Sequence, residues 1–123
     1  AVDPALRHIA ERPAQANTAG RAAARPGIPA GDVDRAARQV IAEAGYGAAF
    51  FHRTGHGLGM EAHEAPYMFA ENDQLLEPGM TFTVEPGIYL TGRGGVRVED
   101  DVVVTPGGSE TLSDLPRHLV FLG

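Results

Sequence analysis

The sequence contains no cysteine and no lysine. Without cysteine, the chain has no disulfide bonds, thiolate metal sites or thiol nucleophiles. All ten basic residues are arginines, and they stand against sixteen acidic residues, which gives a formal charge of −6. No stretch of clustered basic residues offers the footprint that nucleic-acid phosphates require. We therefore expect no nucleic-acid partner.

Long hydrophobic runs are also missing. No apolar segment approaches the roughly 18 residues that span a membrane. The N-terminus shows no basic region followed by an apolar stretch, which is the pattern of a secretory signal. We therefore expect a soluble, cytoplasmic protein with no membrane partner. The 123 residues fit one domain or part of a larger one.

The first part of the chain, residues 1–45, is predicted to be helical because it is rich in alanine and arginine. Pro13 should kink or split the first helix. Residues 25–31 contain prolines and glycines and are predicted to form a loop. A further helix is expected from a cap at Asp32 to a stop at Gly45.

The second part, residues 46–123, is predicted to be rich in strands and loops. A short strand is expected over residues 48–53, and two longer strands over residues 80–90 and 95–105. The glycine-rich segment around Gly92 should form the turn between the longer strands. Helices followed by antiparallel strands indicate an α+β fold in which the helices pack on an antiparallel sheet.

The predicted hairpin places two glutamates opposite each other. Glu85 lies seven residues before the turn centre at Gly92, and Glu99 lies seven after it. Like charges in directly opposed positions are destabilising unless a cation lies between them. Side chains alternate between faces, so Tyr89 and Arg97 should share the face of the glutamates. The competing interpretation is a solvated hairpin with scattered exposed acids.

Three histidines, His52, His56 and His63, lie in a segment rich in glycine, HRTGHGLGMEAHEAP. The glycines disfavour a helix, so a strand that ends in a loop is expected. Neutral imidazole is a common metal ligand, and one imidazole with several carboxylates favours Mn, Co, Zn or Fe. A lone histidine is usually structural or exposed, and this interpretation applies to His8 and His118.

Four motifs closely resemble the pita-bread metallopeptidases: HRTGHGLG, HEAP, LEPGMTFTVEPGIY and GVRVEDDVVVT. The proline-specific branch is nearest, namely Xaa-Pro dipeptidase (prolidase) and Xaa-Pro aminopeptidase. The resemblance covers about residues 17–120, and the motifs are long and occur in order. It implies a metal-dependent exopeptidase that hydrolyses the Xaa-Pro bond of dipeptides or peptide N-termini through a metal-bridging hydroxide. It also implies a proline-containing peptide as substrate and, for the full-length protein, a homodimer.

The resemblance further implies two divalent metal ions held by two aspartates, one histidine and two glutamates. Carried over by motif, His56 is the histidine ligand, Glu85 is the first glutamate and Glu99 is the second, bridging glutamate. Manganese is the metal expected first, with cobalt or zinc as alternatives.

The same resemblance assigns roles around the metals. Glu85 would relay a proton to the leaving imino nitrogen. His63 looks like the histidine that contacts the substrate carbonyl, and His52 resembles the histidine that lines the substrate pocket. Tyr89 and Arg97 match positions that support the site by hydrogen bonding, in contact with substrate.

The sequence departs from the family pattern in its aspartates. Nothing in residues 1–50 matches the motif that carries the two aspartate ligands, and Asp3, Asp32 and Asp34 are predicted to be helix caps. The chain thus carries three of five expected ligands and resembles the C-terminal half of a pita-bread catalytic domain. We expect its metal site to be incomplete.

Four alternatives to the peptidase hypothesis stay open. One is a partial chain that is inactive by itself. Another is a non-catalytic binding module on the same fold, although such relatives typically lose ligands. Methionine aminopeptidase lacks the Arg-x-Glu-Asp pattern of residues 97–100, and a creatinase-type amidinohydrolase would not need both glutamates as ligands.

Overall fold

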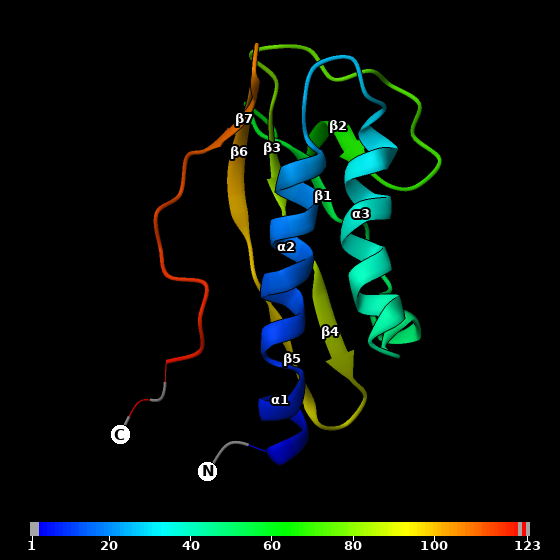
Figure 1. The fold of residues 1–123 in the computed structure, drawn as a ribbon, viewed down its shortest axis with the longest axis vertical. Coiled ribbons are helices and arrows are strands. Elements are labelled where there is room, and N and C mark those ends of the chain that lie inside the picture. Colours follow the sequence, from blue (N-terminus) through cyan, green and yellow to red (C-terminus); the bar gives the residue numbers. More distant parts are fainter. Residues whose placement is uncertain (1–2, 121, 123) are drawn as a thin grey trace.

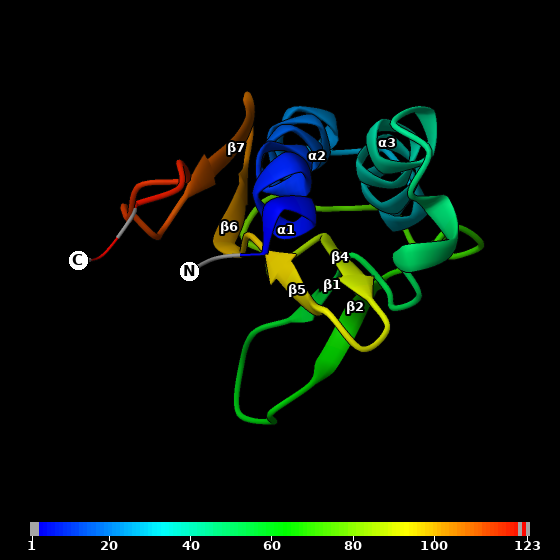
Figure 2. The same cartoon turned by 90° about the horizontal axis from the view of Figure 1, so that it is seen from below.

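The protein has two layers, with helices packed on one side of antiparallel strands (Figures 1 and 2). The computed structural model describes residues 3–120 and 122. The elements, in chain order, are α1 (Pro4–Ile9), α2 (Glu11–Ala23), α3 (Ala30–Glu43), a short 3-10 turn (Gly47–Ala49), β1 (Gly55–Gly57), β2 (Glu64–Met68), β3 (Thr81–Val84), β4 (Gly87–Leu90), β5 (Gly94–Arg97), β6 (Asp100–Thr105) and β7 (Gly108–Thr111). The predicted α+β architecture is confirmed.

The helix at the start of the chain is split, as expected, but at Ala10 rather than at Pro13. Asp3 caps α1, because its Oδ1 accepts a hydrogen bond of 2.8 Å from the amide of Ala5. Pro13 lies in the first turn of α2, where backbone amides have no intrahelical partner and the missing N–H costs little. The hydrogen bond from the amide of Ala5 confirms the predicted cap at Asp3.

The predictions that Asp32 and Asp34 are caps are wrong. Helix α3 begins at Ala30, with the extended Pro29 before it, so both aspartates lie inside the helix. The amide of Ala30 donates to a loop carbonyl, that of Gln74, so the helix start needs no side-chain cap. Asp32 pairs instead with an arginine one turn later, and Asp34 is buried.

The strands form two sheets where the sequence predicted one long hairpin. The larger sheet has five strands in the order β2-β1-β3-β6-β7, and β4 pairs only with β5. The ladder between β3 and β6 ends at Val84 opposite Asp100, and the ladder between β4 and β5 begins at Gly87 opposite Arg97. Pro86 lies in the gap, where it has no amide hydrogen to donate to a ladder.

Both ladders nevertheless keep one register across the gap. In both ladders the residue numbers of two paired residues add up to the same value. Continued across the gap, this register places Glu85 opposite Glu99. The turn that joins β4 to β5 lies over residues 91–93, where Gly92 has a φ of 74°. The predicted turn centre and the predicted opposition of the glutamates are therefore confirmed.

The strand predicted over residues 48–53 is wrong. Residues Gly47–Ala49 form the 3-10 turn, and the following residues have no strand partner until β1 begins at Gly55. The carbonyls of Phe50 and His52 accept hydrogen bonds from the side chain of Arg38 instead of from a neighbouring strand. A side chain on α3 thus replaces the ladder.

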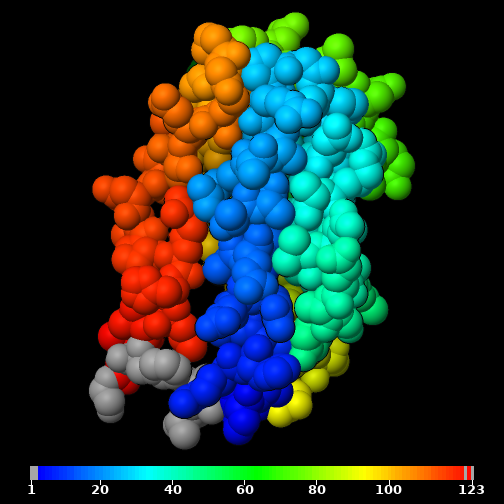
Figure 3. Space-filling model, viewed as in Figure 1, coloured from blue at the N-terminus to red at the C-terminus, as the bar shows by residue number. Residues whose placement is uncertain are grey.

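Two hydrophobic clusters join the layers. The first lies between the helices and the five-stranded sheet and includes Val33, Phe82 and Val102. The second joins α1 and the end of α3 to β4 through Ile9 and Ile88, among others. Figure 3 shows α2 and α3 side by side on the outer face, with the C-terminal segment beside α2. Within the described residues, no helix is long and apolar enough to cross a membrane.

Candidate metal centre

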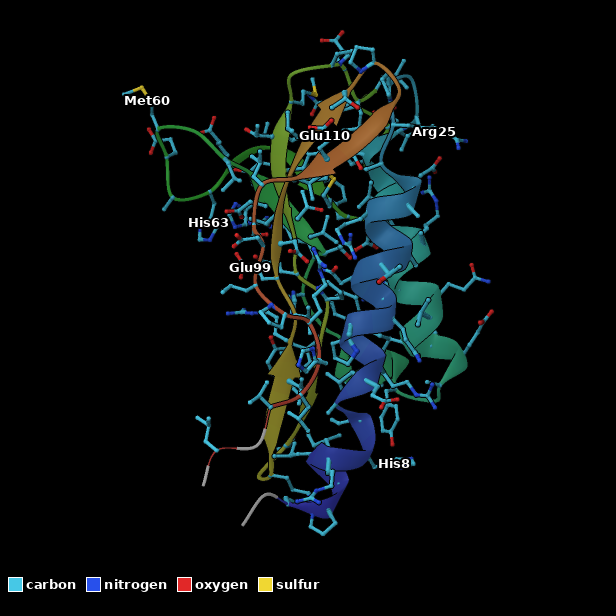
Figure 4. The ribbon with its side chains drawn as sticks, turned by 60° about the vertical axis from the view of Figure 1, so that its left-hand side comes forward. His8, Arg25, Met60, His63, Glu99 and Glu110 are labelled. Carbon is cyan, nitrogen blue, oxygen red and sulfur yellow. The ribbon has the colours of Figure 1, made fainter. Side chains whose placement is uncertain are left out.

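One cavity of about 660 Å³ gathers most of the predicted site residues. Six of the seven line it, namely His52, His56, His63, Glu85, Tyr89 and Arg97. The seventh, Glu99, stands opposite Glu85 at the edge of this cavity and lines the adjoining pocket. In Figure 4, His63 and Glu99 lie on the side of the sheet away from α2 and α3.

Close packing of β1 against β3 brings His56 to the glutamates. A Cβ atom on Gly55 would lie 1.7 Å from the carbonyl oxygen of Thr83, so only glycine allows this approach. The Nδ1 atom of His56 lies 2.9 Å from its neighbour's carbonyl, that of Gly57, which assigns the proton to Nδ1. The Nε2 atom then faces Glu85, 3.7 Å from Oε2.

The two glutamates lie in the gap between the ladders. The amide of Glu85 donates to the carbonyl of Thr54 at 2.7 Å and not to β6. The side chain of Glu85 is 15% exposed and that of Glu99 is 42% exposed. Burial raises the pKa of Glu99, and the charge of Glu85 raises it further. Arg97 opposes this only partly, with its Nε 4.0 Å from Glu99, so the pair favours a cation.

The other two histidines approach the cavity from different segments. His63 is exposed on the loop before β2, and its ring meets that of His56 edge to face with the centroids 4.5 Å apart. His52 holds its Nδ1 2.7 Å from the carbonyl of Arg53. Its Nε2 is buried and, among the described residues, has no hydrogen-bond partner. Burial lowers the pKa of His52, so this ring favours the neutral form.

Tyr89 and Arg97 close the cavity from the two-stranded sheet. A Cβ atom on Gly95, the residue opposite Tyr89, would lie 2.4 Å from the tyrosine ring. The glycine thus leaves room for the ring to lie across the strand, with its centroid 5.4 Å from that of His52. Arg97 follows on β5 as an exposed side chain. As predicted, both residues share the side of the glutamates.

Three further residues line the cavity and were not predicted from the sequence. These are Phe51, Arg53 and Phe69. The guanidinium carbon of Arg53 lies 4.4 Å from the ring centroid of Tyr67. Phe51 and Arg53 flank His52 in the chain, so proximity to a predicted site residue was a signal, whereas nothing in the sequence marks Phe69.

The donors present fit a hard divalent cation, but their number is small. One imidazole nitrogen and two facing carboxylates are the ligand types that Mn²⁺, Co²⁺ or Zn²⁺ takes. Within residues 3–120 and 122, no three histidine, aspartate or glutamate side chains converge closely enough to hold an ion. Asp34 adds no donor to the cavity, because Thr54 and Arg38 occupy its carboxylate.

Known proteins of similar sequence are peptidases by name. The chain is 48% identical to a putative dipeptidase, YkvY, of Bacillus subtilis, over 98% of this chain and 33% of the relative. It is 51% identical to a probable dipeptidase, PepE, of Mycobacterium bovis, over 88% of this chain and 29% of the relative. The chain therefore spans about a third of the length of these relatives.

Solved structures share the fold. A dipeptidase from Pyrococcus horikoshii matches with a TM-score of 0.95 and 49% identity, over 99% of this chain and 34% of its own. An Xaa-Pro dipeptidase from Bacillus anthracis matches with a TM-score of 0.94 and 43% identity, over 98% and 34%. The chain thus has the pita-bread architecture that the motifs implied. The model of metallopeptidase family M24 matches residues 1–106, and the chain belongs to that family.

Proposed function

We propose that the chain carries the histidine and glutamate ligands of a dinuclear metallopeptidase that hydrolyses the Xaa-Pro bond of dipeptides or peptide N-termini. The observation that carries this proposal is the opposition of Glu85 and Glu99, with the Nε2 atom of His56 facing Glu85. Two like charges in this position are otherwise destabilising. The names of the similar proteins, which include an Xaa-Pro dipeptidase, support the substrate class.

Each residue has a role that follows from its place. His56, Glu85 and Glu99 would supply three of the five protein ligands of two divalent ions, with manganese expected first and cobalt or zinc as alternatives. Bound ions of this kind supply Lewis acidity to a scissile carbonyl and acidify water. Glu85, the less exposed carboxylate, moves a proton to the leaving imino nitrogen of proline as a general acid and base.

The remaining residues bind and orient the substrate. His63 is exposed beside His56, where it can donate a hydrogen bond to the carbonyl oxygen that gains charge. His52 lines the cavity beside Tyr89 and would contact the substrate there. Tyr89 and Arg97 form the wall on the side of the two-stranded sheet and hold the substrate against the histidines.

Release of proline tests this function. The full-length protein, purified and equilibrated with Mn²⁺, is expected to release proline from Ala-Pro and to leave Ala-Ala largely intact. Chelation should abolish the release, and returned Mn²⁺ should restore it. Equal hydrolysis of both dipeptides would contradict the proline specificity, and no hydrolysis of either would contradict the peptidase function.

The second candidate function is a chain that is catalytically silent by itself. It is favoured by the absence of any three converging ligands among the residues that the structure describes. Metal content per chain after gel filtration in Mn²⁺ buffer separates the two candidates. Close to two ions per chain supports the dinuclear site, and close to none supports the silent chain.

A further inference from the structure

A buried carboxylate on α3 holds the segment that precedes the histidine strand. Asp34 is fully buried, and its Oδ1 accepts hydrogen bonds from the amide of Thr54 at 3.1 Å and from its hydroxyl at 2.8 Å. Arg38, one turn further along the helix, donates to both carboxylate oxygens at 3.0 Å. Four donors thus satisfy a charge that would be costly to bury alone.

Arg38 also binds the backbone at Phe50 and His52, the earlier part of the segment before β1. Its Nη1 donates to the carbonyl of Phe50 and its Nη2 to the carbonyl of His52, both at 2.7 Å. Its guanidinium carbon also lies 4.0 Å from the centroid of the Phe50 ring. Because Phe50 and His52 belong to no strand, the side chain of Arg38 supplies their carbonyls with hydrogen bonds that a sheet would otherwise provide.

Thr54 connects this segment to the hairpin that carries the glutamates. Its carbonyl accepts the amide of Glu85 at 2.7 Å, and its own amide also donates to the carbonyl of Met68 at 2.9 Å. His52 lies two residues before Thr54, and His56 lies two residues after it. One residue therefore connects α3 to two histidines and one glutamate of the cavity.

We propose that Asp34 and Arg38 are positioning residues for the metal and substrate site. They touch neither substrate nor metal, and they act by fixing the backbone of residues 50–54. This inference rests on the proposed function for the roles of His52, His56 and Glu85. The second acid–arginine pair of α3, Asp32 and Arg35, has side chains 40% and 51% exposed and holds no site residue, so it provides a matched control.

The test compares Asp34→Asn and Thr54→Val with the control Asp32→Asn in the protein. Hydrogen exchange at the Glu85 amide, measured without metal, is expected to accelerate at least about tenfold in the first two variants and to be unchanged in the control. Mn²⁺ affinity is expected to fall about 10-fold to 100-fold, as for other residues that orient metal ligands. Thr54→Ser keeps the hydroxyl and should restore both values.

The outcomes separate positioning from plain stability. Thr54→Val is nearly isosteric and covers the case in which Asp34→Asn fails to fold. If Thr54→Val lowers the melting temperature but matches Asp32→Asn in amide exchange and Mn²⁺ affinity, the inference is wrong. If the unsubstituted protein binds no Mn²⁺, the proposed function fails, and the exchange rate at Glu85 still decides whether Asp34 and Thr54 fix that backbone.

Discussion

The carboxylates of this protein fall into two groups that differ in their partners. The buried aspartates, Asp34 and Asp100, are each matched by arginine and by hydroxyl donors. The hairpin glutamates, Glu85 and Glu99, face each other, with the Nε of Arg97 4.0 Å from Glu99 and the Nε2 of His56 3.7 Å from Glu85. The chain therefore pairs the acids that hold its fold with arginines and leaves the two glutamates beside its cavity only partly compensated.

Asp100 shows how complete the matching is in the first group. Burial acts to raise the pKa of Asp100, but hydrogen bonds from Arg117 and Ser113 hold it below its usual range. The Oδ2 of Asp100 lies 2.7 Å from the Nε of Arg117 and 3.8 Å from that of Arg21. Glu99 and Asp100 are neighbours in the chain but have different roles. Glu99 faces Glu85 beside the cavity, whereas Asp100 binds Arg117 and Ser113 of the C-terminal segment.

The largest effect that tests this comparison is the loss of activity expected for Glu85→Gln. Removing a general acid and base should lower kcat on an Xaa-Pro dipeptide by about 10²-fold to 10⁴-fold. Thermal stability should hold or rise, because a like charge opposite Glu99 is removed. Activity and melting temperature are measured together, with the exposed Glu77→Gln as control. A variant that loses stability while it keeps activity would place Glu85 with the structural acids.

A smaller effect, on stability alone, is expected for Arg117→Ala. It strips a charged hydrogen-bond partner from buried Asp100, which should cost about 2 kcal/mol of unfolding free energy in urea titrations. Arg93→Ala is the control, because its partner Asp3 is less buried. Equal losses in the two variants would show that burial of the acid does not set the cost.

The smallest expected effect is on the pH dependence of stability. Burial lowers the pKa of His52 in the fold, and the charges of Arg97 and Arg38 add to this. Its contribution is therefore fully present above the unfolded pKa of about 6.5 and is lost as pH falls through the folded value. Melting temperatures between pH 7.5 and 5 should fall less in His52→Gln than in the unsubstituted protein. The exposed His8→Gln, remote from His63 in Figure 4, is the control variant at a histidine outside the cavity.

Sequence reasoning succeeded where local pattern decides the structure. The glycine turn fixes the register of the hairpin, so the opposition of Glu85 and Glu99 follows from counting residues about Gly92. Glycines around His56 excluded a helix, and β1 is a strand. These features depend on neighbours in the chain, and a single sequence reports them.

Features that depend on distant parts of the chain were missed. Aspartate is a residue type that often caps helices. Only the contact of Asp34 with Thr54, twenty residues away, shows that its buried carboxylate connects α3 to the segment before β1. Residues 48–53 have strand-like composition, but Arg38 takes their hydrogen bonds. Phe69 reaches the cavity only through the fold. These contacts depend on how the helices pack on the strands. The pattern of apolar residues along the sequence does not reveal that packing.

The shared register of the two ladders has a consequence for how related sequences can vary. An insertion of one residue in the turn at residues 91–93 would shift the pairing by one and turn one of the two glutamates to the opposite face. Residues 91–93 are not among those that line the cavity, yet the length of this turn is constrained by the glutamates seven residues from Gly92 on either side. Among homologues, length changes in this turn should therefore come in pairs of residues or be compensated by a bulge between Glu85 and the turn or between the turn and Glu99.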